Sequence, residues 1–338
     1  MTLHSEVILI TGASGFLGGL LAKALVDSAS QDVGLKLILV DVIKPSLPGG
    51  VEGFAMVEDL TDPWSVERLF KTTLGVPNTI YCLHGVMSRT SEDHFDVALK
   101  VNIDSVRLLL ESARLHKGEK PIKFVFTSSL AVYGGPLPDI ITPLIPTFPE
   151  STYGFSKLTS ELFLSEFSRR GFVDGRIVRL PTVVVRPGKP SGATSSFMSG
   201  IVREPLKGEE SICPIGNGID SPELDLPIWI ASPEITVKNL IHTRTIPAER
   251  FASHTRTVCS PGITITVRDE LRALEKIGGK KALELVKFND DPVNRRIVSS
   301  WPSRFDNSYA IDLGYHVDEG GIEGIVAEFQ RKLNVGLL

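Results

Sequence analysis

Short apolar runs alternate with longer amphipathic stretches through the first half of the chain. The runs lie at Val7–Thr11, Leu37–Asp41, Phe54–Val57, Thr79–Leu83, Phe124–Ser128 and Ile177–Val185. Uninterrupted apolar strands are buried on both faces, which is typical of a parallel sheet between two layers of helices. Helical spacing predicts helices at Leu17–Ser28, Pro63–Thr73, Ser91–Lys117 and Tyr153–Arg170. This alternation predicts an α/β fold with a doubly wound parallel sheet.

The pattern changes after Val185. Residues 186–222 are rich in Pro, Gly and Ser around one expected helix at Ser196–Lys207, and 228–245 predicts a strand, a turn and a helix. Two further helices are expected, at Val267–Gly278 and at Gly321–Lys332. We therefore predict a first domain at 1–185, to which 228–250 returns, and a smaller lobe built from 186–227 and 251–338.

The composition excludes several classes of protein. Of the 338 residues, 42% are hydrophobic and 22% are charged, which is enough apolar material for a core. The net charge of −4 offers no basic face for nucleic acid, and no apolar run approaches the roughly 18 residues of a membrane span. Three widely spaced cysteines, scattered histidines and no signal-peptide pattern predict a cytoplasmic protein without disulfides or a bound metal.

A glycine-rich turn follows the first expected strand. Gly12 permits a tight turn, and Gly15 lets the backbone approach a pyrophosphate. Gly18 lets the next helix pack close to the strand. The N-terminus of that helix attracts phosphate groups. Asp41 ends the second strand, where an acid accepts hydrogen bonds from ribose hydroxyls and repels a 2′-phosphate. The motif predicts a Rossmann-type site that prefers NAD to NADP.

A tyrosine and a lysine open the helix expected at 153–170. Tyr153 and Lys157 are four residues apart, so both side chains lie on one helix face. We expect the lysine ammonium to lower the tyrosine pKa, which would make Tyr153 a general base for an alcohol proton. Ser129 ends the fifth strand, at the edge where open α/β sheets place their sites, and can hold the substrate oxygen near Tyr153. Thr127 and Ser128 are expected to cap the strand end.

Together, GxxGFxG, Asp41, Asp59-Leu60, Asn102, SSLAVYG and YxxxK resemble the extended short-chain dehydrogenase/reductases, the superfamily of NAD-dependent epimerases and dehydratases. The resemblance covers nearly the whole chain. It implies that Asp59 and Leu60 contact the adenine, that Asn102 positions the active-site backbone, and that 181–183 flank the nicotinamide. The cofactor-binding residues so implied are Gly12, Ser14, Gly15, Phe16, Leu17, Gly18, Asp41, Asp59, Leu60, His84, Gly85, Val86, Asn102, Tyr153, Lys157, Pro181 and Val183. His84 departs from the small residue usual in the family, and we expect it to be a packed side chain.

Two stretches of the smaller lobe, Val185–Gly208 and Ser299–Asp306, resemble the D-erythronate dehydrogenases of this superfamily. That resemblance implies NAD-dependent oxidation of the C2 hydroxyl of a four-carbon sugar acid to 2-oxo-tetronate. The implied catalytic residues are Ser129, Tyr153 and Lys157. The candidate substrate-binding residues are Ser88, Ser129, Tyr153, Thr182, Arg186, Ser195 and Ser196, and Arg203 is the alternative to Arg186 as the partner of the substrate carboxylate.

Other functions share these motifs. A nucleotide-sugar epimerase has the same cofactor signature, and a uronate or L-threonine dehydrogenase would use the same chemistry. A dehydratase would carry an acidic pair where this chain has Leu130 and Ala131. A non-catalytic NAD-binding regulator would not need Ser129, Tyr153 and Lys157.

The helices at 91–117 and 153–170 carry apolar residues on several sides, which predicts a homodimer through these helices. These residues include Leu108, Leu109, Leu110, Leu158, Leu162 and Phe163.

Overall fold

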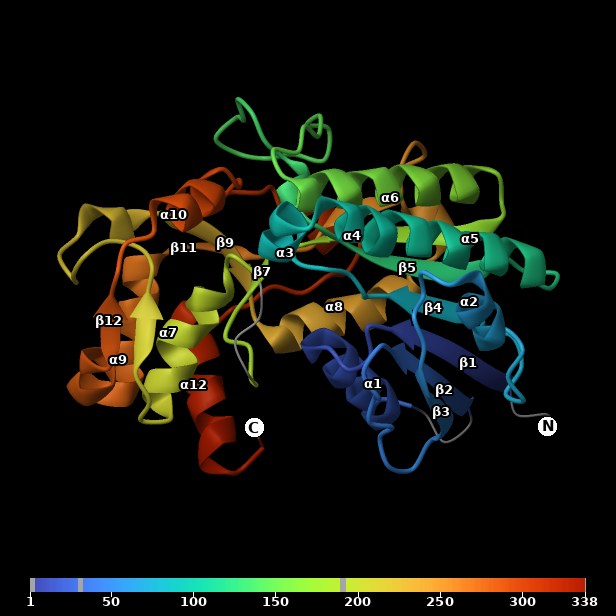
Figure 1. Cartoon of the computed structure of the whole chain (residues 1–338), viewed down its shortest axis with the longest axis horizontal. Coiled ribbons are helices and arrows are strands. Elements are labelled where there is room, and N and C mark those ends of the chain that lie inside the picture. The colour runs from blue at the N-terminus through green and yellow to red at the C-terminus, as the bar shows by residue number, and fades with distance from the viewer. Residues whose placement is uncertain (1–3, 30–32, 189–192, 338) are drawn as a thin grey trace.

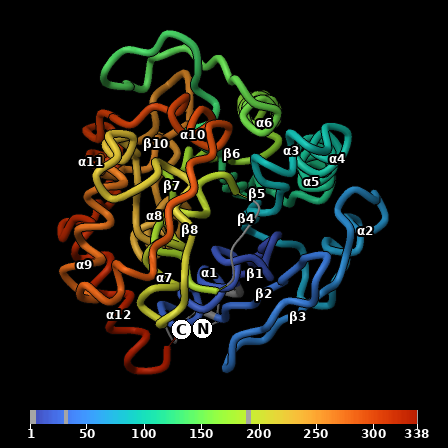
Figure 2. Tube along the Cα trace, turned by 60° about the vertical axis from the view of Figure 1, so that its left-hand side comes forward, coloured from blue at the N-terminus to red at the C-terminus, as the bar shows by residue number. Residues whose placement is uncertain are grey.

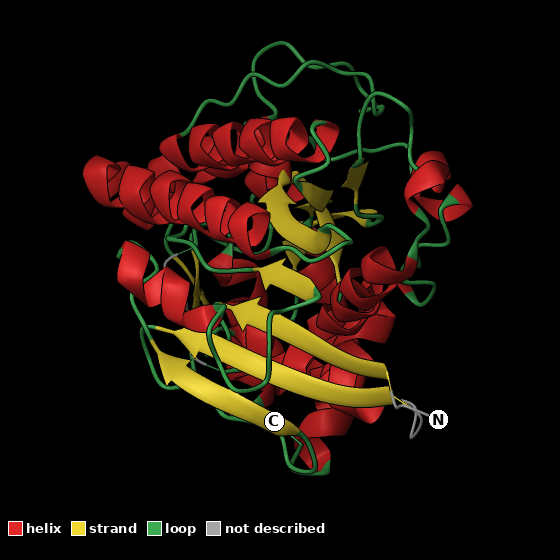
Figure 3. Cartoon of the chain, turned by 90° about the vertical axis from the view of Figure 1, so that its right-hand side faces the viewer, coloured by secondary structure: helices red, strands yellow, loops and turns green. Residues whose placement is uncertain are grey.

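A seven-stranded parallel sheet forms the centre of the computed structural model, which describes residues 4–29, 33–188 and 193–337. The strand order is β10-β6-β5-β4-β1-β2-β3. Figure 1 labels β1 to β5 of this sheet, and Figure 3 shows its strands between helices. The strands are β1 (His4–Thr11), β2 (Val33–Asp41), β3 (Glu52–Val57), β4 (Thr79–Cys82), β5 (Ile122–Ser129), β6 (Val173–Leu180) and β10 (Thr257–Cys259). The predicted Rossmann-type α/β fold is confirmed.

Helices cover both faces of this sheet because successive strand residues point to opposite sides. Val7 and Leu9 pack with α2 (Pro63–Leu69), α5 (Ser105–His116) and α6 (Thr152–Arg169). Ile8 and Ile10 pack with α1 (Phe16–Asp27) and α8 (Pro233–Thr245) on the opposite face. Figure 1 shows the two layers, with α5 and α6 on one side and α1 and α8 on the other.

The prediction of one continuous helix at 91–117 was wrong, because the helix is broken. The segment forms α3 (Ser88–Asp93), α4 (Phe95–Leu99), a π-helical turn at Lys100–Asp104 and then α5. His94 separates α3 from α4 with non-helical backbone angles (φ −137°, ψ 72°). The π turn contains Asn102, and π-helical turns occur frequently at functional sites.

The sixth apolar run also does not form one strand. It leaves the central sheet at Leu180, since Pro181 has no N–H with which to continue the ladder. Thr182–Val183 (β7) then pairs with β9 (Pro227–Ala231), which pairs with β11 (Ile263–Thr266) in a separate three-stranded sheet. β8 (Ser211–Cys213) and β12 (Val286–Phe288) form a two-stranded sheet.

The smaller lobe has its own apolar core. Ile201, Leu274 and Val326 pack together there from α7 (Ser196–Leu206), α9 (Val267–Glu284) and α12 (Gly321–Asn334). The described part of the chain after residue 250 also forms α10 (Pro292–Ser299) and α11 (Ser308–Asp312). Figure 2 shows α7, α9 and α12 gathered away from β1–β3. β10, from the segment assigned to this lobe, pairs with β6 in the central sheet, and the division into domains stays a prediction.

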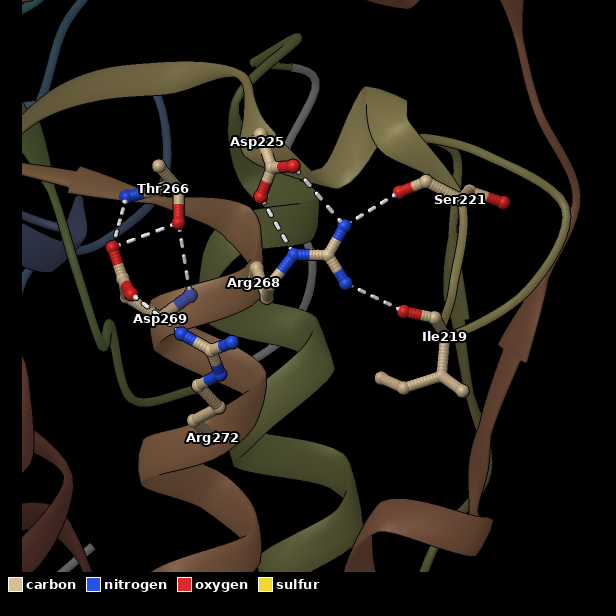
Figure 4. Close-up of polar contacts among 7 residues, drawn as sticks. All are labelled: Ile219, Ser221, Asp225, Thr266, Arg268, Asp269 and Arg272. Atoms are coloured by element: carbon tan, nitrogen blue, oxygen red, sulfur yellow. Dashed lines mark hydrogen bonds and ion pairs between the residues drawn. The ribbon is translucent and has the colours of Figure 1, made fainter.

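Charged side chains fix the start of α9. Thr266 caps the helix in a reciprocal capping box with Asp269. Next to it, Arg268 donates to Asp225 (2.6 Å) and to the carbonyls of Ile219 and Ser221, both at 2.8 Å (Figure 4). This arginine thereby ties the loop before β9 to the helix. α9 continues past the predicted end at Gly278, through a kink at Gly279 (φ 78°).

Candidate active site

A small cavity opens at the carboxyl ends of β4, β5 and β6, where the smaller lobe meets the central sheet. Its volume is about 160 Å³. Predicted site residues that line it are Phe16, Leu17, Ser88, Ser129, Tyr153, Lys157, Pro181, Thr182, Val183, Arg186 and Ser195. The predicted catalytic residues and several substrate candidates therefore face one space.

Three residues of α6, one turn apart, are fixed to three consecutive residues of β5. Tyr153 lies beside Ser129, which interacts with its hydroxyl, and Lys157 Nζ donates to the Thr127 carbonyl (2.9 Å). One turn further, Glu161 accepts a hydrogen bond from the Ser128 hydroxyl. These contacts set the position of the predicted catalytic pair relative to the strand end.

Gly154 allows this close approach of helix and strand. A Cβ atom at this position would lie 2.0 Å from the Ala131 carbonyl oxygen, so any other residue would push α6 away. Ser151 caps the helix and accepts from the Gly154 N–H (3.0 Å). The sequence Ser-Thr-Tyr-Gly thus starts the helix and seats Tyr153 beside Ser129.

The ionisation of the pair differs from the sequence expectation. Burial raises the pKa of Tyr153 to about 12, and the Ser129 hydrogen bond and the Arg186 charge oppose this only in part. Burial lowers the pKa of Lys157 to about 8, while Cys82 and Glu161 act in the opposite direction. Lys157 Nζ lies 5.8 Å from the centre of the tyrosine ring. The chain's own residues therefore do not produce the expected low tyrosine pKa.

The glycine turn fits a dinucleotide phosphate. Gly12 has a positive φ of 68°, and a Cβ at Gly18 would lie 2.3 Å from the Gly12 carbonyl oxygen. α1 begins directly after Gly15 and has no side-chain cap, so the N–H groups of its first turn can bind an anion. Phe16 and Leu17 line the cavity from this helix.

The acids predicted to bind adenosine lie at the ends of β2 and β3. Asp41 accepts hydrogen bonds from the Ser14 N–H (3.0 Å) and the Val42 N–H (2.7 Å), which place its carboxylate beside the glycine turn. Asp59 accepts from Thr61, and Leu60 is buried. None of these predicted residues lines the catalytic cavity, as expected of groups that would bind the far end of an extended cofactor.

Asn102 fixes the segment after β4. Its side-chain oxygen accepts from the Val86 N–H (2.9 Å), and its amide donates to the Val86 carbonyl (3.1 Å) and to Ser156 (3.1 Å). A Cβ at Gly85 would lie 2.9 Å from the Asn102 oxygen, which explains the glycine. The π turn thereby connects the segment after β4 to α6, beside the predicted catalytic lysine.

His84 lies behind the cavity rather than in its wall. Its Nδ1 lies 2.7 Å from Thr11 Oγ1, and its Nε2 lies 2.6 Å from Ser105 Oγ. Burial, together with the positive charge of Lys157, lowers its pKa to about 3. A neutral imidazole that joins β1 to α5 accounts for this departure from the family pattern.

We expect this histidine to make folding stability pH-dependent. The unfolded chain binds a proton at His84 below about pH 6.5, whereas the folded chain does so only near pH 3, so stability falls as the pH drops through this window. The loss at pH 4 is on the order of 3 kcal/mol. In urea unfolding, His84→Gln should therefore lower the unfolding free energy by less at pH 5 than at pH 8, because the wild type has already lost part of its stability at pH 5. His254→Gln, at an exposed site, is the control, and a pH-independent cost at His84 would contradict the assignment.

On the substrate side, Arg186 lines the cavity and Arg203 does not. Arg186 interacts electrostatically with Tyr153, and burial lowers the pKa of its guanidinium to about 10. Arg203 is buried, pairs with Glu204 and donates to the Arg186 carbonyl (2.9 Å). Ser199 accepts from the Arg186 N–H (3.0 Å). Arg203 and Ser199 therefore support the loop that carries Arg186.

The predicted hydroxyl residues separate into two groups. Ser88, Thr182 and Ser195 line the cavity, and Ser88 also contacts Thr194 (3.1 Å between the hydroxyl oxygens). Ser196 begins α7 and does not line the cavity. Ser128 and Thr127 bond to Glu161 and to the Cys82 carbonyl, in agreement with their expected structural role.

Glu161 and Trp301 are among the residues at the site that were not singled out from the sequence. Glu161 lies one turn after Lys157 on the same helix face, and its spacing is the signal that could have identified it. Trp301, within the Ser299–Asp306 stretch, lines the cavity from the smaller lobe. Phe305 of the same stretch packs on Tyr133 (5.8 Å between ring centres), so this segment closes over the end of β5.

Comparison with known proteins places this site in a family. The model of the NAD dependent epimerase/dehydratase family matches residues 8–221, and the chain belongs to that family. The expected class, an extended short-chain dehydrogenase/reductase and an oxidoreductase acting on CH–OH groups, is confirmed.

Particular relatives extend the likeness to the whole chain. The D-erythronate dehydrogenase of Haemophilus influenzae is 38% identical over 323 residues, which are 95% of this chain and 98% of that protein. The D-erythronate dehydrogenase of Cupriavidus necator is 38% identical over 317 residues, 92% of this chain and 94% of that protein. The crystal structure of a nucleoside-diphosphate-sugar epimerase from Agrobacterium tumefaciens is 34% identical, with a TM-score of 0.88 over 99% of this chain and 97% of that one.

No described helix is long and apolar enough to cross a membrane. Within residues 4–29, 33–188 and 193–337, no group of three or more His, Cys, Asp or Glu side chains could hold a metal ion.

Proposed function

We propose that this protein is an NAD-dependent oxidoreductase that oxidises the C2 hydroxyl of a small sugar acid of the D-erythronate type to the 2-oxo acid. One observation carries the proposal. Ser129, Tyr153 and Lys157 face the same small cavity as a largely buried arginine, Arg186. A hydroxyl-activating pair beside a buried guanidinium suits a substrate that carries a hydroxyl next to a carboxylate. The two D-erythronate dehydrogenases similar over most of their length support this choice.

Each residue has a distinct role in this proposal. Ser129 holds the C2 oxygen, and Tyr153 as phenolate accepts the hydroxyl proton while C2 gives up its hydrogen as hydride. Lys157 stabilises the phenolate and binds the cofactor ribose. Arg186 binds the substrate carboxylate, and Ser88, Thr182 and Ser195 offer hydroxyl groups to the rest of the substrate. The C–H bond and the O–H bond break as the C2 carbonyl forms.

The cofactor that we assign is NAD. The glycine turn and α1 would bind its pyrophosphate, Asp41 its adenosine ribose, and Asp59 and Leu60 its adenine. Gly85, Val86, Pro181 and Val183 would bind its nicotinamide half. When bound, NAD⁺ supplies the hydride acceptor for the reaction. The Asp41 carboxylate disfavours the 2′-phosphate of NADP.

The second candidate is a nucleotide-sugar epimerase, favoured by the 34% identical nucleoside-diphosphate-sugar epimerase from Agrobacterium tumefaciens. An epimerase would use the same Tyr153 and cofactor, but it would not need a guanidinium that binds a carboxylate, such as Arg186 in this cavity. A uronate or L-threonine dehydrogenase is the alternative among the acid-oxidising enzymes, and a non-catalytic NAD-binding regulator has the least support because all three catalytic side chains are present.

The homodimer through 91–117 and 153–170 also remains our proposal. Leu109 and Leu110 are buried in the core and cannot contribute to an interface. Phe95 and Val97 on α4 and Phe155 and Leu162 on α6 are exposed, and Leu162 is 64% exposed. A monomer in sedimentation velocity at micromolar concentration would contradict this proposal. The cytoplasmic location stays a prediction from the sequence.

The test of the function is NADH formation at 340 nm with four- to six-carbon aldonates, uronates and L-threonine. We expect turnover with D-erythronate and NAD, and at least about 100-fold lower kcat/KM with NADP, because Asp41 repels the extra phosphate. Turnover with another hydroxy acid alone would contradict the substrate assignment. Epimerisation of a nucleotide sugar without net NADH would favour the second candidate.

A further inference from the structure

A second cavity, of about 470 Å³, lies next to the candidate active site. Its lining comes from α3, from 150–151 and from α10, and its polar part includes Arg89, Glu92, Glu150 and Arg296. Ser88 lines both this outer cavity and the active-site cavity, and it is the described residue common to the two linings. Its side chain therefore forms part of the wall between them.

The wall is joined by hydrogen bonds between three segments that are distant in the sequence. Ser88 Oγ lies 3.1 Å from Thr194 Oγ1 and accepts from the Thr194 N–H (3.2 Å). Asn294 of α10 donates to the Thr194 carbonyl (3.3 Å). Ser88 and Thr194 are both buried. The contact thus connects α3, the loop before α7 and α10 at one point.

The proposed substrate orientation directs its distal carbons toward this wall. The C2 hydroxyl lies at Ser129 and Tyr153, and the carboxylate lies at Arg186. This orientation would bring carbon 3 and the atoms beyond it to another part of the lining, which includes Met87, Ser88, Ser195 and Trp301. Among these four residues, only Ser88 borders a second cavity that could accept a longer chain.

We propose that the Ser88–Thr194 contact ends the substrate pocket and selects hydroxy acids of four carbons over those of five or six. This inference rests on the proposed function and adds the residue that sets chain length. Each extra hydroxymethyl group of a longer acid would meet the Ser88 side chain. With that side chain removed, the polar lining of the outer cavity would offer hydrogen-bond partners to the added hydroxyls.

The test compares kcat/KM for D-erythronate with that for five- and six-carbon aldonates of matching configuration at C2 and C3. The wild type should prefer the four-carbon acid by about 100-fold, since a pocket discriminates by roughly 10–200-fold per added group. Ser88→Gly should reduce this preference at least 10-fold, mainly through a lower KM for the long acids. Ser88→Ala should shift it in the same direction by less, and Ser88→Thr, which retains a hydroxyl, should preserve it.

Ser300→Ala is the matched control. It removes a hydroxyl from the outer cavity without touching the Ser88–Thr194 contact, and it should leave the preference unchanged. An unchanged preference in both Ser88→Gly and Ser88→Ala, with D-erythronate still oxidised, would overturn the inference and leave the proposed function in place. Equal use of all chain lengths by the wild type would overturn it as well. A wild type that oxidises no aldonate would instead overturn the proposed function, and the inference with it.

Discussion

Tyr153→Phe is expected to lower kcat by at least about 1,000-fold and to leave NADH affinity within about threefold of the wild type. The substitution removes the hydroxyl that accepts the substrate proton, and positioned general bases contribute roughly 100- to 10,000-fold. The phenyl ring retains the packing of the half-buried side chain beside Ser129 and Lys157. Steady-state NADH formation measures the first quantity, and NADH fluorescence titration measures the second.

Tyr309→Phe is the matched control for this variant. Its hydroxyl accepts from the Ala252 N–H (2.9 Å), and the residue does not line the cavity, so turnover should be unchanged. If Tyr153→Phe retained turnover within 10-fold of the wild type, Tyr153 would not be the base. Loss of NADH affinity together with turnover would instead indicate that the tyrosine hydroxyl serves cofactor binding rather than proton transfer.

The pKa values of Tyr153 and Lys157 predict that activity rises from neutral pH to about pH 8, above which Lys157 loses the charge that stabilises the phenolate. The Tyr153 pKa of about 12 means that little phenolate forms near neutral pH from the chain's own residues. A nearby positive charge lowers the pKa of a phenol, and Arg186 already does so. The oxidised nicotinamide would bring a further positive charge to this cavity. The sequence pattern identified the pair of residues, but it carried no information about the burial that dominates their pKa values.

The fold was predictable because its signal is local and repeated. Runs such as Val7–Thr11 and Leu37–Asp41 must be buried on both faces, and only a covered parallel sheet provides that environment. The glycine turn was predictable for a related reason. Its residues are needed where the chain makes close backbone contacts, as Gly18 does with the Gly12 carbonyl.

The broken helix and the substrate lobe were not predictable in this way. Periodicity treats 91–117 as one amphipathic helix, since a single π turn shifts the helical face without altering its composition. The turn is stabilised by a segment distant in the sequence, through the hydrogen bonds between Asn102 and the main chain of Val86. Likewise, Arg186 and Arg203 have similar surroundings in the sequence. Their different roles depend on Glu204 and on the position of the loop relative to Tyr153, which only the folded lobe defines.

Removing one partner of the Arg179–Glu161 ion pair is expected to cause the largest of the predicted losses in unfolding free energy. Arg179 of β6 donates to both carboxylate oxygens of Glu161 (2.9 and 2.6 Å), and the two side chains are almost fully buried. Arg179→Met leaves the Glu161 carboxylate buried with only the Ser128 hydroxyl as a partner, which should cost about 3–5 kcal/mol of unfolding free energy. Arg179→Met combined with Glu161→Met removes both charges and should recover most of this loss. Urea unfolding of the single and double variants measures the coupling.

The same helix provides a control for this experiment. Arg169 and Glu166 form an exposed ion pair of similar geometry on α6, and Arg169→Met should have little effect because solvent screens the pair. A loss at Arg179 no larger than that at Arg169 would show that the buried pair is not required for stability. Recovery of stability in the double variant without recovery of turnover would assign the pair a second role. Glu161 also bonds Ser128 and raises the pKa of Lys157, so removing its charge should disturb the catalytic lysine even in a fully folded protein.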